Sequence, residues 1–250
     1  NYTDQQGILL NNYTKRLNAK ITYDAKPVRW LDISSNIMVN HTWMNSVNDT
    51  GGGQTARRTM WEMPSIFPVK FPDGSWSNSQ FEGNKLNFGL EAMSNPVHEL
   101  ETMKRNRYRT KIFGNLAFTF HLLDGLDLRT QIGVDGNLRS NKDYAPNDLI
   151  KISSPRGTAS MYHGERLYWQ EETYLSYNKV LNGIHRLNAT LGMSWSKYTE
   201  TSSNTGDVRD FDSNFYGYDN LEVGLSATKP PTSEWKQWSM NSYFGRVSYG

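Results

Sequence analysis

A long stretch of alternating apolar and polar residues at 107–140 constrains the fold of this chain more than any other feature. Apolar side chains occupy every second position in two arms, which flank a turn around Asp124 and Gly125. They are Ile112, Leu116, Phe118 and Phe120 in the first arm, and Leu126, Leu128, Ile132, Val134 and Leu138 in the second. A period of two is the period of a β-strand, so the stretch predicts an antiparallel hairpin. Each arm keeps the pattern for about a dozen residues, roughly twice the usual strand length of a soluble domain.

Strands of this length, apolar on one face and polar on the other, are typical of a wall between hydrocarbon and water. The composition agrees. With 36% hydrophobic residues and a mean hydropathy of −0.71, the 250 residues hold no apolar run long enough for a transmembrane helix. A barrel strand needs apolar residues only at alternate positions, and its other face can be polar. The 14 Tyr, 8 Trp and 10 Phe are the residue types that gather at membrane interfaces.

The same alternation recurs along the chain. It predicts an all-β fold of about seven long antiparallel strands, which form part of a large transmembrane β-barrel. The expected strands lie near 13–25, 30–43, 107–121, 126–140, 167–179, 185–199 and 237–250. Short turns are expected at 25–28, which contains Pro27, at Asp124-Gly125, and at Asn182-Gly183, a strong tight-turn pair.

The connections between the hairpins are long, at 44–106, 141–166 and 200–236. Only the first shows a helix signal: Asn95 can cap a helix, Pro96 suits its first position, and the helix would run to about Lys104. Barrels of the outer membrane have short periplasmic turns and long extracellular loops. We therefore expect the short turns on the periplasmic side and the long connections on the extracellular side. Aromatic residues then fall in two belts. The periplasmic belt holds Tyr23, Phe118, Phe120, Tyr177 and Tyr249, and the extracellular belt holds Trp43, Tyr108, Trp169, Trp195 and Trp238.

About seven strands cannot close such a wall, because an open edge in hydrocarbon leaves backbone groups unpaired. We therefore expect 1–250 to be one part of a barrel domain whose remaining strands lie elsewhere in the polypeptide.

Several segments, taken in order, resemble a known family. They are MPSIFPVKFPDGSW at 63–76, NPVHELE at 95–101, KIFGNLAFTFHLLDGLDLRTQIGVD at 111–135 and WQEETYLSYNKVLNGIHRLNATLGMS at 169–194. Together they look like the barrel region of SusC/RagA-type TonB-dependent transporters. The resemblance implies an outer-membrane barrel of about twenty-two strands with an N-terminal plug in its lumen. It also implies a SusD-like surface lipoprotein over the mouth, and import of glycans or peptides driven by the TonB complex. The plug and the parts that contact TonB have no counterpart in this chain.

Six aromatic residues in the long loops are candidate contacts for a substrate or for a lid protein, because their rings can stack on sugars or pack against a partner. They are Trp61, Trp76, Phe81, Phe211, Phe215 and Tyr216. On the strands, Lys20, Arg129, Asp135 and Asn188 fall on the polar face and are expected to face the lumen.

Other chemistry has little support. Asp210, Asp212 and Asn214 resemble the start of a calcium loop, but Phe215 stands where such a loop needs glycine, so calcium is only a weak possibility. The histidines have no metal spacing, and no catalytic arrangement can be proposed, so we predict neither a metal site nor an enzyme. The chain has no cysteine, and its net charge of +2 gives no signal for nucleic acid.

Two alternatives remain open. A siderophore or metal-chelate TonB-dependent receptor would share the barrel and lack the lipoprotein lid. A soluble β-rich glycan-binding or adhesin module would also use alternation and exposed aromatic rings, but it predicts short, balanced loops at both ends.

Overall fold

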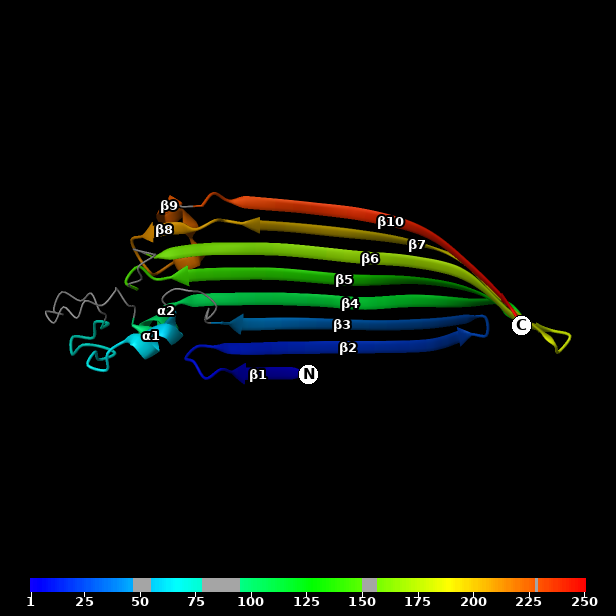
Figure 1. Cartoon of the computed structure of the whole chain (residues 1–250), viewed down its shortest axis with the longest axis horizontal. Helices are drawn as coiled ribbons and strands as arrows, with labels where there is room; N and C mark the ends of the chain where they lie inside the picture. The colour runs from blue at the N-terminus through cyan, green and yellow to red at the C-terminus, as the bar shows by residue number, and fades with distance from the viewer. Residues whose placement is uncertain (47–54, 78–94, 150–156, 228) are drawn as a thin grey trace.

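The computed structural model describes residues 1–46, 55–77, 95–149, 157–227 and 229–250. Its described part is one antiparallel sheet in which eight strands follow the order β1-β2-β3-β4-β5-β6-β7-β10, with β8 and β9 attached at one end (Figure 1). The eight strands are β1 (Tyr2–Gln6), β2 (Tyr13–Val28), β3 (Leu31–Asn45), β4 (Lys104–Leu123), β5 (Leu126–Ala145), β6 (Thr158–Leu181), β7 (His185–Asn204) and β10 (Thr232–Tyr249). The predicted all-β antiparallel fold is confirmed.

The smaller elements gather at the end of the sheet where the long connections lie, which we call the rim (Figure 1). They are the helices α1 (Ala56–Glu62) and α2 (Pro96–Thr102), the strands β8 (Val208–Phe211) and β9 (Gly224–Ala227), and the 3₁₀ turns η1 (Gly217–Asp219) and η2 (Leu221–Val223). The sequence did not indicate α1, β1, β8 or β9. The predicted helix at Pro96 is present but ends at Thr102, because Lys104 already pairs in β4. No helix in the described ranges is both long and apolar enough to cross a membrane.

The strands extend further toward the rim than the alternation predicts. Residues 141–145 and 158–166, expected in a loop, pair along β5 and β6, and β6 is 24 residues long. Similarly, β7 continues to Asn204 and β10 begins at Thr232, inside the loop expected at 200–236. The backbone pairing continues after the period of two has ended, and the period was the only signal available in the sequence.

The opposite end of the sheet, the turn end, carries tight connections. Asp124-Gly125 joins β4 to β5 with Gly125 at a φ of 82°, and Asn182-Gly183 opens the β6–β7 turn with φ of 52° and 71°. Both turns were predicted. The turn predicted at 25–28 is wrong, since β2 runs through Val28 and the chain reverses at Arg29 and Trp30. Pro27 is tolerated inside the strand because the register shifts between Ala25 and Val28, where a strand can lack a donor.

The register places the alternating apolar residues of all long strands on a common face, which we call the apolar face. One cross-strand row joins Leu31, Phe120, Leu128, Leu175 and Leu191 from β3 to β7. The other face, the polar face, holds Lys20, Arg129, Asp135 and Asn188, as predicted. Trp238 also lies on the polar face, directly opposite Tyr198. Belt residues must lie on the face that meets the membrane, so the prediction that Trp238 belongs to the extracellular belt is wrong.

An acidic residue lies within the apolar face. Glu171 of β6 is flanked by Ile132 and Trp195 on the neighbouring strands, and its carboxylate accepts hydrogen bonds from the hydroxyls of Thr130 and Thr173. Two donors from the same face therefore satisfy this carboxylate.

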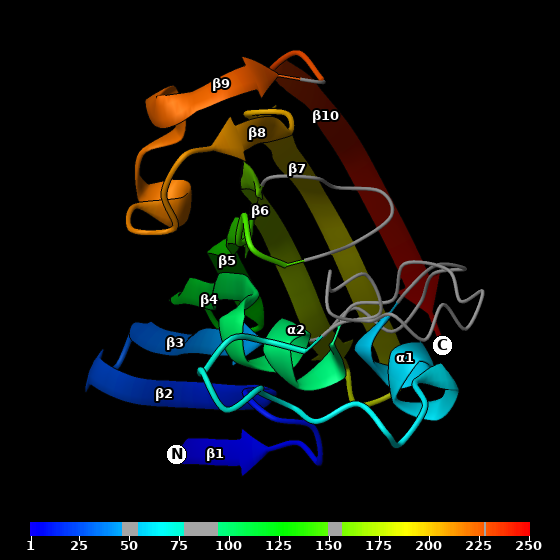
Figure 2. The same cartoon turned by 90° about the vertical axis from the view of Figure 1, so that its left-hand side faces the viewer.

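Successive hairpins are staggered in one direction. Leu31, the first residue of β3, pairs with Phe120, three residues before the end of β4 at Leu123. Leu126, the first residue of β5, pairs with Tyr177, four residues before the end of β6 at Leu181. A stagger of constant sign tilts the strands relative to the edge of the sheet, as the wall of a barrel requires. Viewed from the rim, the sheet follows an open arc, with α1 and α2 on one side and β8 and β9 on the other (Figure 2).

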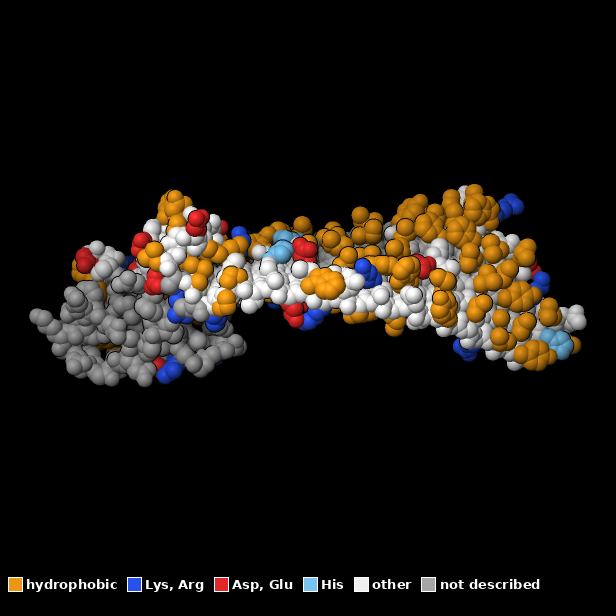
Figure 3. All heavy atoms as spheres, turned by 90° about the horizontal axis from the view of Figure 1, so that it is seen from above, with side chains coloured by type: hydrophobic (Ala, Val, Ile, Leu, Met, Phe, Trp, Pro, Cys, Tyr) orange, Lys and Arg blue, Asp and Glu red, His pale blue; other side chains and the backbone are white. Residues whose placement is uncertain are grey.

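Burial of apolar side chains is confined almost entirely to the rim. The described apolar residues that are fully buried are Ala56, Leu100, Ala117, Tyr144, Ala145, Leu149, Ala159 and Phe211, and all but Ala117 lie there. Along the rest of the sheet, large apolar side chains stay exposed, such as Leu191 at 68% and Val247 at 74%. In the space-filling view, apolar side chains cover much of the half of the sheet near the turn end (Figure 3).

Candidate functional site

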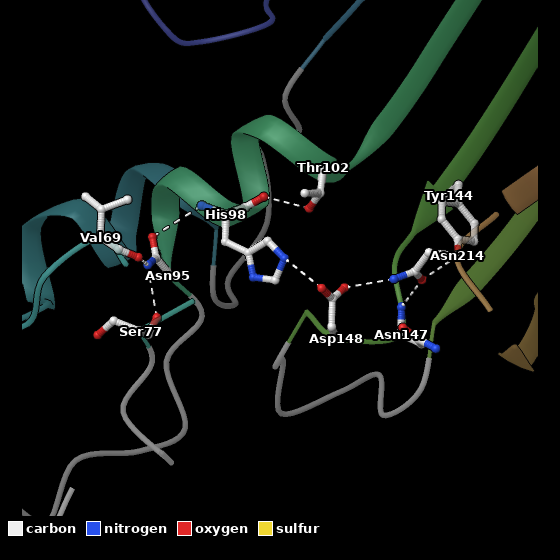
Figure 4. Close-up of polar contacts among 9 residues, drawn as sticks. All are labelled: Val69, Ser77, Asn95, His98, Thr102, Tyr144, Asn147, Asp148 and Asn214. Atoms are coloured by element: carbon white, nitrogen blue, oxygen red, sulfur yellow. Dashed lines mark hydrogen bonds and ion pairs between the residues drawn. The ribbon is translucent and has the colours of Figure 1, made fainter. Parts of the chain in front are cut away.

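The rim contains a polar network that joins segments far apart in the sequence, and Asn95 is its first centre. Its side-chain oxygen caps α2 by accepting from the backbone N–H groups of Val97 and His98, at 3.0 and 3.2 Å. Its amide nitrogen donates to the carbonyl oxygens of Val69 and Ser77, at 2.8 and 2.9 Å (Figure 4). One buried side chain thus holds the segment 69–77 against the start of α2.

His98 lies at the centre of the same network. Its ring stacks on Trp76 with centroids 4.3 Å apart, and the Lys70 ammonium lies 4.0 Å from the centroid of a Trp76 ring. The Nε2 atom lies 3.5 Å from a carboxylate oxygen of Asp148, in the segment that follows β5 (Figure 4). Burial lowers the pKa of His98 below its ordinary value, although the Asp148 carboxylate acts in the opposite direction. The imidazole is therefore held in its neutral form.

Asn214 completes the network on the far side of Asp148. Its side-chain oxygen accepts from the hydroxyl of Tyr144 and from the backbone N–H of Asn147, each at 2.7 Å, and its amide donates to Asp148 at 3.1 Å. These bonds use the oxygen that a cation would need. In the described ranges, no group of three or more His, Cys, Asp or Glu residues is arranged to hold a metal ion. Calcium binding at Asp210, Asp212 and Asn214 stays a prediction.

The six predicted aromatic contacts separate into packing residues and exposed ones. Phe211 is 2% exposed and packs edge-on against Tyr144 in the small rim core with Ala159, so no face of its ring is open to a ligand. Trp76 is partly buried between His98 and Lys70. Phe81 lies outside the described residues.

Three rings remain accessible at the rim. Trp61 of α1 is 86% exposed, Phe215 is 82% exposed and Tyr216 is 50% exposed. Phe215 and Tyr216 contact each other edge to face, with centroids 5.0 Å apart. Binding of a substrate or partner by these three residues stays a prediction. Among the described members of the predicted set, they are the ones whose rings are exposed enough to contact a ligand.

The polar face carries a second group, which sequence analysis missed. Tyr198 stacks on Trp238 with centroids 5.6 Å apart, and Tyr168 lies beside Trp238 at 5.9 Å. Next to Tyr168, a hollow of about 220 Å³ opens over Gly133, with Phe113, Asp135 and Glu172 among its walls. The aromatic residues belong to three strands, and only the register between the strands could have placed them together.

The chain resembles the "RagAB peptide transporter", with a TM-score of 0.76 and 17% sequence identity over 100% of this chain. It is equally similar to the RagAB peptide importer in its open-open state (TM-score 0.76, 18% identity) and its closed-closed state (TM-score 0.75, 17% identity). No protein-family model matches the sequence, and no curated protein matches it.

At this identity the likeness shows the fold alone. The chain has the fold of part of a transporter barrel, and it spans 28% or 27% of the length of the chains that it resembles.

Proposed function

We propose that this chain forms part of the wall of an outer-membrane barrel that imports glycan or peptide nutrients. The sheet contributes one arc of the cylinder, with its apolar face toward lipid and its polar face toward the lumen. The turn end lies in the periplasm and the rim outside the cell. Import is driven by TonB through parts of the protein beyond these residues, including a plug.

The exposed apolar face is the observation that carries this proposal. Soluble proteins seldom expose a continuous apolar patch of more than a few hundred Å². Here apolar side chains follow each other across the long strands, and no second layer of described residues covers them. Because transfer from water to hydrocarbon favours apolar surface, a bilayer is the environment in which this face is stable. The tilted register and the likeness to the RagAB importers support the same assignment.

The rim would then receive the external partner. The predicted partner is a SusD-like surface lipoprotein that closes over the barrel mouth. Trp61, Phe215 and Tyr216 are the accessible rings that could contact it or the substrate.

Spin labels on the two faces test the membrane assignment. The chain has no cysteine, so single variants within it can be labelled cleanly: Leu191→Cys on the apolar face and Ser194→Cys on the polar face of β7. In the protein reconstituted into vesicles, we expect the label at 191 to be accessible to oxygen and shielded from a water-soluble nickel chelate. The label at 194 should show the reverse. Equal access of the chelate to both labels would contradict the proposal.

Purification from the outer membrane then separates the nutrient importer from the siderophore receptor. A stoichiometric lipoprotein that co-purifies with the barrel supports the importer. Its absence, together with binding of an iron chelate, supports the receptor.

A further inference from the structure

Four successive polar-face positions of β4 are basic: Arg105, Arg107, Arg109 and Lys111. The two nearest the rim have an acidic neighbour. Asp143 of β5 lies directly opposite Arg105, and its carboxylate is 2.7 Å from an Nη atom of Arg107. The two farther from the rim, Arg109 and Lys111, form no ion pair with any described residue.

The residue directly opposite Arg109 is Arg139 of β5. Like charges at directly opposed positions of an antiparallel pair destabilise it. Both side chains are exposed, so their guanidinium groups are accessible from the polar face. Arg139 has no acidic partner in the described ranges either, so three cationic groups share a small area without compensation.

The charges packed around this group do not remove the imbalance. Arg166 of β6 lies directly opposite Glu200, so these two opposite charges offset each other. Glu165 lines a hollow with Arg139 and Arg166, but it lies opposite Leu138 in the register of the apolar face, and its carboxylate is 3.0 Å from the imidazole of His163. Asp135, two residues before Asn137 on β5, has no ion pair with a described residue.

A second unsatisfied group lies at the same place. Asn137 is opposite Lys111, lines the hollow that Arg139 and Arg166 also line, and is 4% exposed. Its side-chain oxygen is buried and has no hydrogen-bond partner among the described residues. This oxygen is an acceptor, so only a donor can satisfy it, such as a hydroxyl or N–H group that a solute carries beside its carboxylate.

We propose that Arg109, Arg139 and Lys111 form an oxyanion subsite on the inner wall, which binds a carboxylate carried by the imported solute. Two guanidinium groups can each hold a carboxylate through paired N–H donors, and the lysine adds a point charge. The bound anion relieves the repulsion between the opposed arginines. This inference rests on the proposed function and narrows it, since it makes acidic glycans or acidic peptides better solutes than their neutral counterparts.

Citrate, a small polycarboxylate, serves as the probe for binding. We expect calorimetry on the full-length protein at fixed ionic strength to detect citrate binding. Arg139→Gln should weaken it at least about fivefold, as the loss of a charge-assisted hydrogen bond implies. Lys20→Gln is the matched control, because Lys20 lies on the same face of β2, away from the subsite. Equal citrate binding by the Arg139 variant would overturn the proposal.

The sign of the stability change gives an independent test. Without citrate, Arg139→Gln removes a repulsion, so we expect its melting temperature to exceed that of the unchanged protein. Saturating citrate should reverse the order, because only the unchanged protein gains from the anion. A lower melting temperature for Arg139→Gln without citrate would show that Arg139 is already paired, and the proposal would fail.

Measurements of peptide import test whether the carboxylate that binds the subsite is part of the imported solute. Cells should import a glutamate-rich peptide better than its glutamine counterpart. Arg109→Gln should lower import of the glutamate peptide more than import of the glutamine peptide and so remove the preference, which the control Lys20→Gln should keep. If citrate binds but the preference is absent, the subsite serves an acidic segment of the protein itself, and the proposal is overturned. Failure of the proposed function is distinct, because it would appear as chelate access to the label at position 191.

Discussion

The rim and the rest of the sheet, which we call the wall, are built from the same chain but are stabilised in different ways. At the rim, Tyr144, Ala159 and Phe211 form a small buried core, and side-chain hydrogen bonds tie loops to helices. Along the wall, the backbone ladder between strands of up to 24 residues is the main interaction, and the apolar side chains remain exposed. The rim has the organisation of a protein folded in water. The wall has an apolar face that no described residue covers, and this is the face that we propose to lie in lipid.

The largest effect should come from the rim core. Phe211→Ala removes a ring that is 2% exposed, and we expect a loss of about 3–5 kcal/mol of local stability, the usual cost of emptying a buried aromatic site. Hydrogen exchange of the amides in β8 and at the rim end of β6 would measure it. Phe215→Ala, at a ring 82% exposed, is the matched control and should change the exchange little. Equal effects of the two variants would mean that the rim has no core of its own.

A charge placed on each face of the wall tests the comparison directly. Leu191→Arg puts a cation on the apolar face, between Leu175 and Gly245, and should cost about 2–4 kcal/mol if that position lies near the bilayer midplane. Ser194→Arg places the same charge on the polar face, opposite Glu172, and should cost far less. Urea titrations of the protein folded into vesicles give both values. Similar costs on the two faces would contradict the lipid assignment.

The Asn95 amide has a smaller, more local effect. Asn95→Ala removes the cap of α2 and the two bonds to Val69 and Ser77, and should cost about 2–3 kcal/mol, since the cap contributes about 1 and each of the two hydrogen bonds about 0.5–1. Asn95→Asp keeps the capping oxygen but loses the donor, so its effect should be intermediate. Proteolysis at 69–77 would report the opening of this segment. An aspartate variant as susceptible as the alanine variant would assign the whole effect to the lost donor.

The mildest expected effect is a pH dependence of the rim. The pKa of His98 is lowered in the folded state, so the unfolded chain takes up a proton at a higher pH than the folded one. The resulting stability is complete above the unfolded pKa of about 6.5 and declines as the pH falls below it. Relative to the intrinsic exchange rate at each pH, the protection of the α2 amides should therefore fall between neutral and mildly acidic pH, and this fall should disappear in His98→Asn. Protection that rises at acidic pH would show that the Asp148 contact dominates over burial.

The sequence predicted the wall much better than the rim. The alternation at 107–140 is local information, and so are the turn residues Asn182-Gly183 and the Asn95-Pro96 helix start, all of which are present. The strand ends at 141–145 and 158–166 were missed because nothing in the side-chain pattern marks them. The burial of Phe211 and the contacts of Trp76 depend on residues that are distant in the sequence, so no spacing could separate them from the exposed ring of Phe215. The same reason concealed the facing pair Arg109 and Arg139.

The unbroken pairing from β2 to β10 also limits how this gene can change in length. Side chains alternate between the two faces, so one codon inserted in the middle of β6 would exchange the apolar and polar faces for every residue up to the next turn, and would move Glu172 onto the apolar face. Viable insertions and deletions within the wall should therefore come in matched even numbers. The connections at the rim are free of this parity, which makes them the part of the protein where new lengths, and with them new specificities, can arise.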